Sequence, residues 1–381
     1  MTVLGSCRLS DPAGRGPITR RERVLAALSH QRGDGTPYSV SFTPPAWRRM
    51  ADCYGDERFH EKIGEHLARV SVVGSGWGQR DAEGFFTDDF GTRWDRRIES
   101  SVGLPLPSLD RRSIDAYPWP DPAKSGRFDE LARVRREQPD IFLLLCIECS
   151  LFERAWALVG FEQFLMDLAA EPRFAGDVLD RILDFNLGLV AAGLDACPDV
   201  DGVLFGDDFG AQNGLLVGPE LWHKTIAPRL ARQYAAVKER GKKLFVHSCG
   251  KIDALIDDFC RMGVDCLNPL QPEAMNVYDL KDRYGERLAF YGGIGTQQLL
   301  SRSSPAGVRE ELGRILERLG RDGGYIASPG LPITGDLPAE NVHAMIEVFN
   351  AQIPTGSRMG DLPRGRTGVP PRANGRPGTD K

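Results

Sequence analysis

The sequence predicts an α/β fold built as a single (β/α)8 barrel. Short apolar segments alternate with helical patterns along most of the chain, which indicates parallel βαβ units with right-handed crossovers. About eight such units fit into roughly 335 residues, the number that closes a barrel. Neither a G-x-G-x-x-G nor a G-x-x-x-x-G-K-[ST] motif follows any of these segments, so dinucleotide-binding and P-loop folds are not indicated.

The predicted strands are short runs of apolar and β-branched residues, and several of them end at glycine or a polar residue. In chain order the strands are expected at residues 38–42, 70–73, 141–147, 202–205, 244–246, 264–269, 288–291 and 325–327. The helical patterns begin at capping residues or proline and stop at glycine. They are expected at residues 23–28, 46–54, 58–67, 128–137, 161–170, 173–194, 219–240, 253–262, 277–284, 305–319 and 338–352.

The segment from Gly74 to Pro122 departs from this alternation. Residues 88–95 resemble a strand and turn with polar tips, and the proline-rich stretch 104–122 is expected to be a surface loop. An insertion of this length in a compact domain usually covers or shapes a site. We therefore expect residues 1–17 to be a flexible leader, residues 18–353 to form the barrel with this insertion, and residues 354–381 to be a disordered tail rich in Pro, Gly and Arg.

Composition excludes several classes of partner. The chain is 41% hydrophobic and 27% charged with a formal net charge of −5, so neither nucleic acid nor an anionic membrane surface is an expected partner. No apolar run approaches the roughly 20 residues that span a bilayer, and the N-terminus lacks the pattern of a secretory signal. The eight cysteines do not form a disulfide framework, so reduced thiols and a cytoplasmic location are expected.

Polar side chains stand at the carboxyl ends of the predicted strands. In a barrel these ends all face one mouth, where chemistry is expected. The residues at these positions are Glu148, Cys149, Asp207, Asp208, His247, Cys249, Gln271, Glu273, Tyr291 and Ser328. His247 and Cys249 leave an extended segment on the same face and could share a zinc ion, which needs at least one further protein ligand. The alternative is a hydrogen-bonded histidine beside a core cysteine.

The acidic residues of the mouth leave two interpretations open. Glu148 is a metal ligand or general base, or else the ion-pair partner of Arg154. One of Asp207 and Asp208 binds substrate or orients a base, with Gln212 as a nearby polar partner, or else the pair caps a turn.

Seven passages of the chain resemble one enzyme family. They are Arg21–His30, Asp88–Trp94, Leu151–Leu158, Gly206–Gln212, Val246-His-Ser-Cys-Gly250, Asn268-Pro-Leu-Gln-Pro-Glu273 and Gly323–Gly330. Together they resemble the uroporphyrinogen decarboxylase superfamily over roughly residues 19 to 350. That superfamily includes zinc-dependent methyltransferases, and the resemblance implies a TIM barrel, in agreement with the strand and helix pattern.

Two departures from the family pattern bear on function. The Arg-Gln-Ala-Gly-Arg-Tyr signature that clamps porphyrinogen carboxylates is absent after Tyr38, so porphyrinogen decarboxylation is not implied. The methyltransferase branch resembles this chain more closely, and its His-x-Cys zinc pair matches His247 and Cys249. Its third cysteine ligand falls on Leu331. Either Glu148 or Cys149 completes a different site, or the chain works by acid–base chemistry without zinc.

The resemblance implies methyl transfer or O/N-demethylation of a small molecule, with zinc at His247 and Cys249 and a corrinoid or tetrahydrofolate as methyl carrier. Glu148, Asp207 or Asp208, and Tyr291 are the expected catalytic residues. The expected substrate-binding residues are Arg154, Gln212, Gln271 and Glu273. A corrinoid protein and a second copy of the chain, in a homodimer, are the expected macromolecular partners.

The alternative is a metal-free decarboxylase or lyase acting on a small carboxylate. It requires basic residues at the mouth, and the expected ones are Arg93, Arg96 and Arg154.

Overall fold

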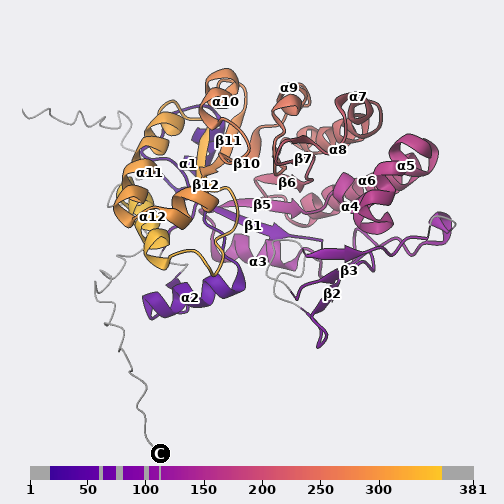
Figure 1. The fold of residues 1–381 in the computed structure, drawn as a ribbon, viewed down its shortest axis with the longest axis horizontal. Coiled ribbons are helices and arrows are strands. Elements are labelled where there is room, and N and C mark those ends of the chain that lie inside the picture. The colour runs from indigo at the N-terminus through magenta and orange to yellow at the C-terminus, as the bar shows by residue number, and fades with distance from the viewer. Residues whose placement is uncertain (1–17, 60–62, 74–79, 98–102, 111–112, 354–381) are drawn as a thin grey trace, which may run out of the picture.

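A curled parallel sheet forms the centre of the protein (Figure 1). The computed structural model describes residues 18–59, 63–73, 80–97, 103–110 and 113–353, so the predicted leader and tail lie outside the described residues. The strand order is β1-β5-β6-β9-β10-β11-β12, and every adjacent pair is parallel. The strands are β1 (Leu67–Ser71), β5 (Phe142–Ile147), β6 (Gly202–Gly206), β9 (Lys243–His247), β10 (Cys266–Leu270), β11 (Ala289–Ile294) and β12 (Tyr325–Pro329).

The extended segment 37–42 occupies the eighth position of the ring. On one side the Ser39 amide donates to the Ala327 carbonyl (3.1 Å), and the Ala327 amide donates to the Pro37 carbonyl (2.8 Å). On the other side the His66 amide, just before β1, donates to the Tyr38 carbonyl (3.0 Å). The segment therefore links β12 to β1, and the predicted barrel is confirmed.

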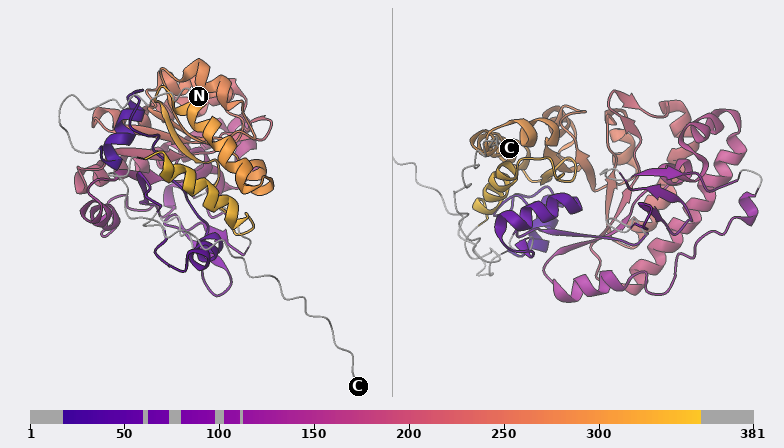
Figure 2. Two further views of the ribbon diagram at one scale, coloured as in Figure 1. Left: turned by 90° about the vertical axis from the view of Figure 1, so that its left-hand side faces the viewer. Right: turned by 60° about the horizontal axis from the view of Figure 1, so that its bottom comes forward.

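Helices surround the sheet on its outer side (Figure 2). They are α1 (Arg20–Leu28), α2 (Pro44–Tyr54), α3 (Asp129–Glu137), α4 (Phe152–Val159), α5 (Phe161–Ala170), α6 (Pro172–Ala196), α7 (Pro219–Leu221), α8 (Ala227–Glu239), α9 (Ile256–Arg261), α10 (Val277–Tyr284), α11 (Pro305–Gly320) and α12 (Ala339–Ala351). Within its described residues, the stretch 58–67 holds no α-helix, contrary to expectation, and Gly64 has a φ of 76° that an α-helix does not accommodate. Among the described residues no helix is both long and apolar enough to cross a membrane.

Alternate residues of the strands fill the inside of the barrel. The fully buried side chains there include Leu144, Leu204, Phe245 and Ile326. Val24 and its neighbours on one face of α1 close the amino-terminal end of the barrel. The other face of each strand packs against the helices in a larger cluster. Burial on both faces explains why these strands are continuous apolar runs. It also leaves the carboxyl ends of the strands as the place for polar chemistry.

The insertion folds as a small antiparallel sheet beside the barrel. It consists of β2 (Phe85–Thr87), β3 (Arg93–Asp95) and β4 (Leu104–Leu106), in that order. The start of the expected proline-rich loop is thus a strand, because residues 104–106 pair with β3. Trp94 from β3 is buried, and its indole donates to Asp88 (2.9 Å). A further hairpin, β7 (Gly210–Ala211) and β8 (Gly214–Leu215), follows β6.

Glu65 makes stability depend on pH at the barrel seam. Its carboxylate accepts from the Val40 amide (2.6 Å) and the Ser39 hydroxyl (3.2 Å), and burial raises the pKa of Glu65 to about 7. Between its unfolded and folded pKa values the folded state binds more protons, so Glu65 lowers the free energy of unfolding as pH rises. Glutamine does not titrate. We therefore expect the unfolding free energy of Glu65→Gln, relative to that of the wild type, to rise by roughly 2 kcal/mol between pH 5 and pH 8. Urea unfolding at both pH values, with exposed Glu57→Gln as control, measures this; a difference independent of pH would contradict it.

Candidate active site

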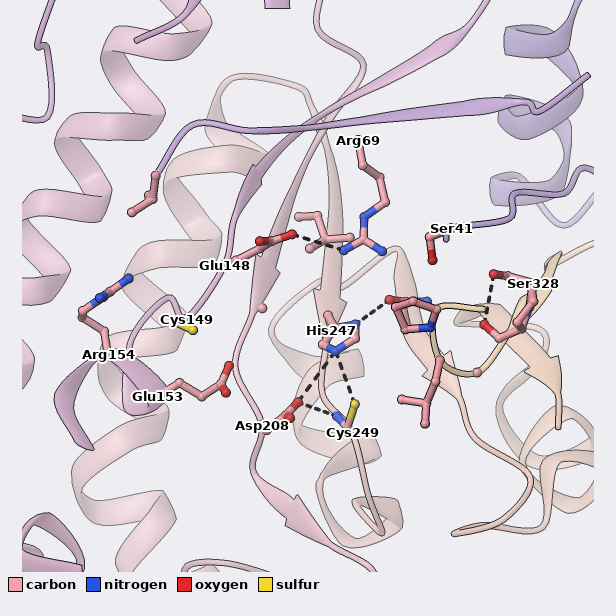
Figure 3. A pocket seen from close by; sticks show the side chains of 18 of the residues that line it. Ser41, Arg69, Glu148, Cys149, Glu153, Arg154, Asp208, His247, Cys249 and Ser328 are labelled. Atoms are coloured by element: carbon pink, nitrogen blue, oxygen red, sulfur yellow. Dashed lines mark hydrogen bonds and ion pairs between the residues drawn. The ribbon is translucent and has the colours of Figure 1, made fainter. Parts of the chain in front are cut away.

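A cavity opens at the carboxyl ends of the barrel strands (Figure 3). Its volume is about 140 Å³, below the roughly 300–1,000 Å³ of pockets for drug-sized ligands. Side chains from β1, the ends of β5, β6 and β9, and the loop after β12 line it, and the insertion adds Asp88, Trp94 and Arg96. The insertion therefore shapes the site, and the space suits a small molecule.

Three potential metal ligands meet in this cavity. The distance between His247 Nε2 and Cys249 Sγ is 3.4 Å, and that between His247 Nε2 and Asp208 Oδ1 is 3.7 Å. The ligand atoms of all three residues lie within 4.8 Å of one another. The Cys249 amide also donates to Asp208 Oδ1 (2.7 Å), which ties the end of β6 to the end of β9. The predicted His-x-Cys pair thus gains a carboxylate as its third member.

Asn268 on β10 sets the orientation of the His247 ring. His247 Nδ1 lies 2.6 Å from Asn268 Oδ1, and Asn268 Nδ2 donates to the Tyr291 carbonyl (3.1 Å). Because the Asn268 amide nitrogen donates to that carbonyl, the Asn268 amide oxygen faces the ring and accepts a hydrogen bond from Nδ1–H of His247. Nε2 is then left with a lone pair toward Cys249 and Asp208, which is the form of histidine that binds metal.

The residues present fit a zinc ion. A histidine nitrogen, a cysteine sulfur and a carboxylate oxygen are all zinc ligands, and catalytic zinc sites hold three protein ligands and one open position. Burial and the nearby Asp208 and Glu153 carboxylates raise the pKa of the Cys249 thiol well above its usual value. A divalent cation among these groups would supply the positive charge that opposes this effect.

The other expected zinc ligands lie in the same cavity but outside this group. Leu331, at the position of the family's third cysteine, lines the cavity, as do Glu148 and Cys149. Among the described residues, Asp208, not Glu148 or Cys149, joins His247 and Cys249 in a cluster of potential ligands. Asp208 therefore lies where it could supply a ligand in place of the missing cysteine.

Asp207 faces away from the cavity, although it adjoins Asp208. It is 1% exposed, and its carboxylate accepts from the backbone amides of Leu151, Phe152 and Glu153 (2.6–3.1 Å). It therefore caps the start of α4, whereas the capping alternative placed this role at the turn after its own strand. Burial raises the pKa of Asp207 to about 7 despite these hydrogen bonds.

The ion pairs of the cavity differ from those expected. Arg154 pairs with Asp88, and both side chains are buried, so the predicted Glu148–Arg154 pair is wrong. Glu148 instead faces Arg69, with Nη2 and Oε1 3.7 Å apart. Arg93 lies outside the cavity lining and pairs with Glu83 (2.5 Å).

Glu153 is a site residue that the sequence analysis did not select. It comes from the first turn of α4, lines the cavity and is 6% exposed. Burial, followed by the nearby charges of Asp208 and Asp207, raises the pKa of Glu153 well above its usual range. A raised pKa favours the protonated form of a carboxyl group, and this form can donate its proton to a leaving group.

The remaining expected residues lie behind or around the cavity, outside its lining. Tyr291 is in the barrel interior among apolar side chains. Gln271 is buried and accepts from the Gly250 amide (3.1 Å), which holds the loop after Cys249. Gln212 donates to the Glu273 carbonyl (2.7 Å), and the Glu273 side chain accepts from the Gln297 amide. Gln212, Gln271 and Glu273 thus support the loops of the mouth, whereas Tyr291 packs in the barrel interior.

Replacing Asp207 is expected to affect stability rather than metal binding. Asp207→Ala leaves three buried amides of α4 without their acceptor, so we expect a loss of about 1–3 kcal/mol in unfolding free energy. Denaturant titration and metal analysis of the folded variant measure the two properties. Loss of metal at unchanged stability would show that Asp207 is a ligand.

Replacing Asn268 is expected to weaken metal binding. Asn268→Leu removes the acceptor of the His247 Nδ1 proton, and partners of this kind contribute roughly 10- to 100-fold in metal affinity. Competition with a chromophoric zinc chelator measures the affinity, and Asn276→Ser, which keeps a capping side chain at the exposed N-cap of α10, is the control. Equal zinc affinity in Asn268→Leu and the wild type would contradict the assignment.

Known proteins resemble this chain in sequence and in structure. The uroporphyrinogen decarboxylase (URO-D) family model matches residues 104–352. The uroporphyrinogen decarboxylase of Methylococcus capsulatus is 36% identical over 83 residues, which span 22% of this chain and only 23% of that protein. The enzyme of the same name from Aeromonas salmonicida is 22% identical over 289 residues, 70% of this chain and 72% of that protein.

A solved structure, a methyltransferase from Methanosarcina mazei, superposes with a TM-score of 0.66 at 18% identity. It covers 88% of this chain and 99% of that one, and at this identity it shows the shared fold. The family model spans more than half of the chain and the fold agrees with it. The protein therefore belongs to the uroporphyrinogen decarboxylase family.

Proposed function

We propose that the protein is a zinc-dependent methyltransferase or demethylase that moves a methyl group between a small molecule and a thiol. The observation that carries the proposal is the cluster of Asp208, His247 and Cys249 at the edge of a cavity. The structural neighbour described as a methyltransferase supports it at the level of fold. A corrinoid or tetrahydrofolate as methyl carrier, a corrinoid protein as partner and a homodimer are parts of this proposal.

The side chains around the cluster have separate tasks in this mechanism. When bound by Asp208, His247 and Cys249, zinc would keep an acceptor thiol in its nucleophilic thiolate form at neutral pH. Asn268 holds the His247 ring in the ligand tautomer. Glu153 faces the cavity and its pKa is raised, so it would serve as the proton donor to the leaving group if a methoxy or amine compound is demethylated.

The Arg154–Asp88 pair forms a wall of the cavity rather than a reacting group. Both partners are buried, and the Asp88 carboxylate also accepts from the Trp94 indole. Breaking a buried pair of this kind leaves an uncompensated charge, so its members hold the insertion against the barrel. The reacting molecule then lies between this wall and the metal ligands.

A metal-free decarboxylase or lyase is the second candidate, and a specific observation favours it. Arg69, Arg96 and Arg154 all line the cavity, which suits a carboxylate substrate. The cavity volume and the missing arginine-rich signature do not favour a porphyrinogen as that substrate. Dependence of activity on zinc separates the two candidates.

Removing metal ligands tests the proposed function. We expect Cys249→Ser and Asp208→Ala to lose bound zinc and, with it, methyl transfer from methylcobalamin or methyltetrahydrofolate to a thiol, because two protein ligands seldom hold zinc. Elemental analysis and thiol-consumption assays measure both properties. Exposed Cys53→Ser is the control and is expected to keep zinc. A zinc-free Cys249→Ser variant with full activity would contradict the proposal.

A further inference from the structure

The segments that follow β6 and β9 stay connected beyond the ends of these two strands. The hydroxyl oxygen of Ser248, a fully buried side chain, accepts from the Phe209 amide (2.9 Å). Further along, the Lys251 amide donates to the Ala211 carbonyl (2.8 Å). Each segment carries one of the potential metal ligands between these two bonds in its sequence, so the two ligands are enclosed by them.

Two glycines face each other where the segments meet. A Cβ atom added to Gly250 would lie 2.6 Å from the Gly210 carbonyl oxygen. A Cβ atom added to Gly210 would lie 2.8 Å from the Cys249 carbonyl oxygen and 2.9 Å from the Lys251 amide nitrogen. Side-chain carbons do not come this close to backbone atoms in a packed protein, so a larger residue at either position pushes the segments apart.

The segment after β6 is held firmly by the core. Phe209 is buried, and its ring centroid lies 6.1 Å from that of Phe152, 5.9 Å from that of Trp222 and 6.3 Å from that of Phe259. Its carbonyl also accepts from the Leu216 amide (2.8 Å). Since this side is fixed by packing, the segment after β9 is expected to move when an atom is inserted between the two.

We propose that Gly210, Gly250 and Ser248 are positioning residues, which together form a loop junction that sets the distance between the Asp208 carboxylate and the Cys249 thiol. The inference rests on the proposed function, because this distance matters for a metal ion that both groups bind. Zinc binds oxygen at about 2.0–2.2 Å and sulfur at about 2.3 Å. An outward shift of the segment after β9 therefore removes one of the two ligands from its reach.

Gly210→Ala tests the loop junction, and Gly214→Ala is the matched control. Both glycines belong to the β7–β8 hairpin, and neither has a left-handed φ. A Cβ atom at Gly214 meets no atom within 4 Å. We expect Gly210→Ala to bind zinc roughly 10- to 100-fold more weakly than the wild type, the range for residues that support metal ligands, and Gly214→Ala to bind it equally well. Competition with a chromophoric chelator measures both.

Cobalt(II) in place of zinc separates a positioning role from a purely structural one. The wild type and Gly214→Ala are expected to show a thiolate-to-cobalt charge-transfer band from Cys249. Gly210→Ala is expected to lose most of this band at a cobalt concentration that saturates the wild type. Unchanged zinc affinity together with an unchanged band in Gly210→Ala would overturn the proposal, even if its urea midpoint were lower.

Ser248→Ala tests the same junction without inserting an atom. It removes the acceptor of the Phe209 amide, so the two segments are joined less firmly and zinc affinity is expected to fall several-fold. Because nothing is inserted, this variant keeps the test decisive if Gly210→Ala does not fold. Zinc affinity and cobalt band equal to those of the wild type would count against the junction here as well.

A measurement without metal distinguishes this inference from the proposed function. In metal-stripped protein, iodoacetamide modifies Cys249 at a rate that depends on opening of its segment, and peptide mass spectrometry identifies the modified site. We expect several-fold faster modification of Cys249 in Gly210→Ala and Ser248→Ala, and the wild-type rate in Gly214→Ala. A wild type that binds no zinc would overturn the metal mechanism, while faster modification would still support the loop junction. Equal rates in all four proteins would overturn the junction itself.

Discussion

The parallel register of three neighbouring strands determines the candidate centre. β6 pairs with β9 so that Gly206 lies opposite His247, and β9 pairs with β10 so that His247 lies opposite Asn268. Asp208 and Cys249, each two residues further along its own strand, are therefore brought together at one edge. A shift of one residue would turn side chains to the opposite face and separate these groups. The chemistry thus depends on backbone pairing in the barrel.

The cavity combines two kinds of charge arrangement. On the insertion side, Arg154 and Asp88 are buried and paired, which suits a structural wall. On the barrel side, Asp208, His247 and Cys249 form the cluster of potential metal ligands, and Arg69 lies 3.7 Å from Glu148. The potential metal ligands and an arginine therefore line the same small cavity.

Much of the fold could be predicted because its signals are local. The strands are buried on both faces, so continuous apolar runs mark them, and the polar residues that follow mark the mouth. Helix α4 was not among the predicted helices because its amides are capped by Asp207, which is remote in the chain. For the same reason the sequence could not tell Asp207 from Asp208, since one turns to α4 and the other to the cavity.

Other site residues were missed for identifiable reasons. Arg69 precedes the predicted strand 70–73, which begins three residues later than β1 begins in the structure. Its signal was a charged residue within an otherwise apolar strand. Asn268 carried a similar signal in β10, but its contact with His247 depends on the pairing of two strands. Such cross-strand contacts follow from register, which a single sequence does not specify.

X-ray absorption spectroscopy at the zinc edge of the metal-loaded protein tests the central claim most directly. The account predicts one sulfur ligand at about 2.3 Å, with nitrogen and oxygen ligands at about 2.0–2.2 Å, and loss of the sulfur signal in Cys249→Ser. Two sulfur ligands would show that Cys149 completes the site in place of Asp208. A zinc spectrum without sulfur would contradict the assignment of Cys249 and, with it, the proposed centre.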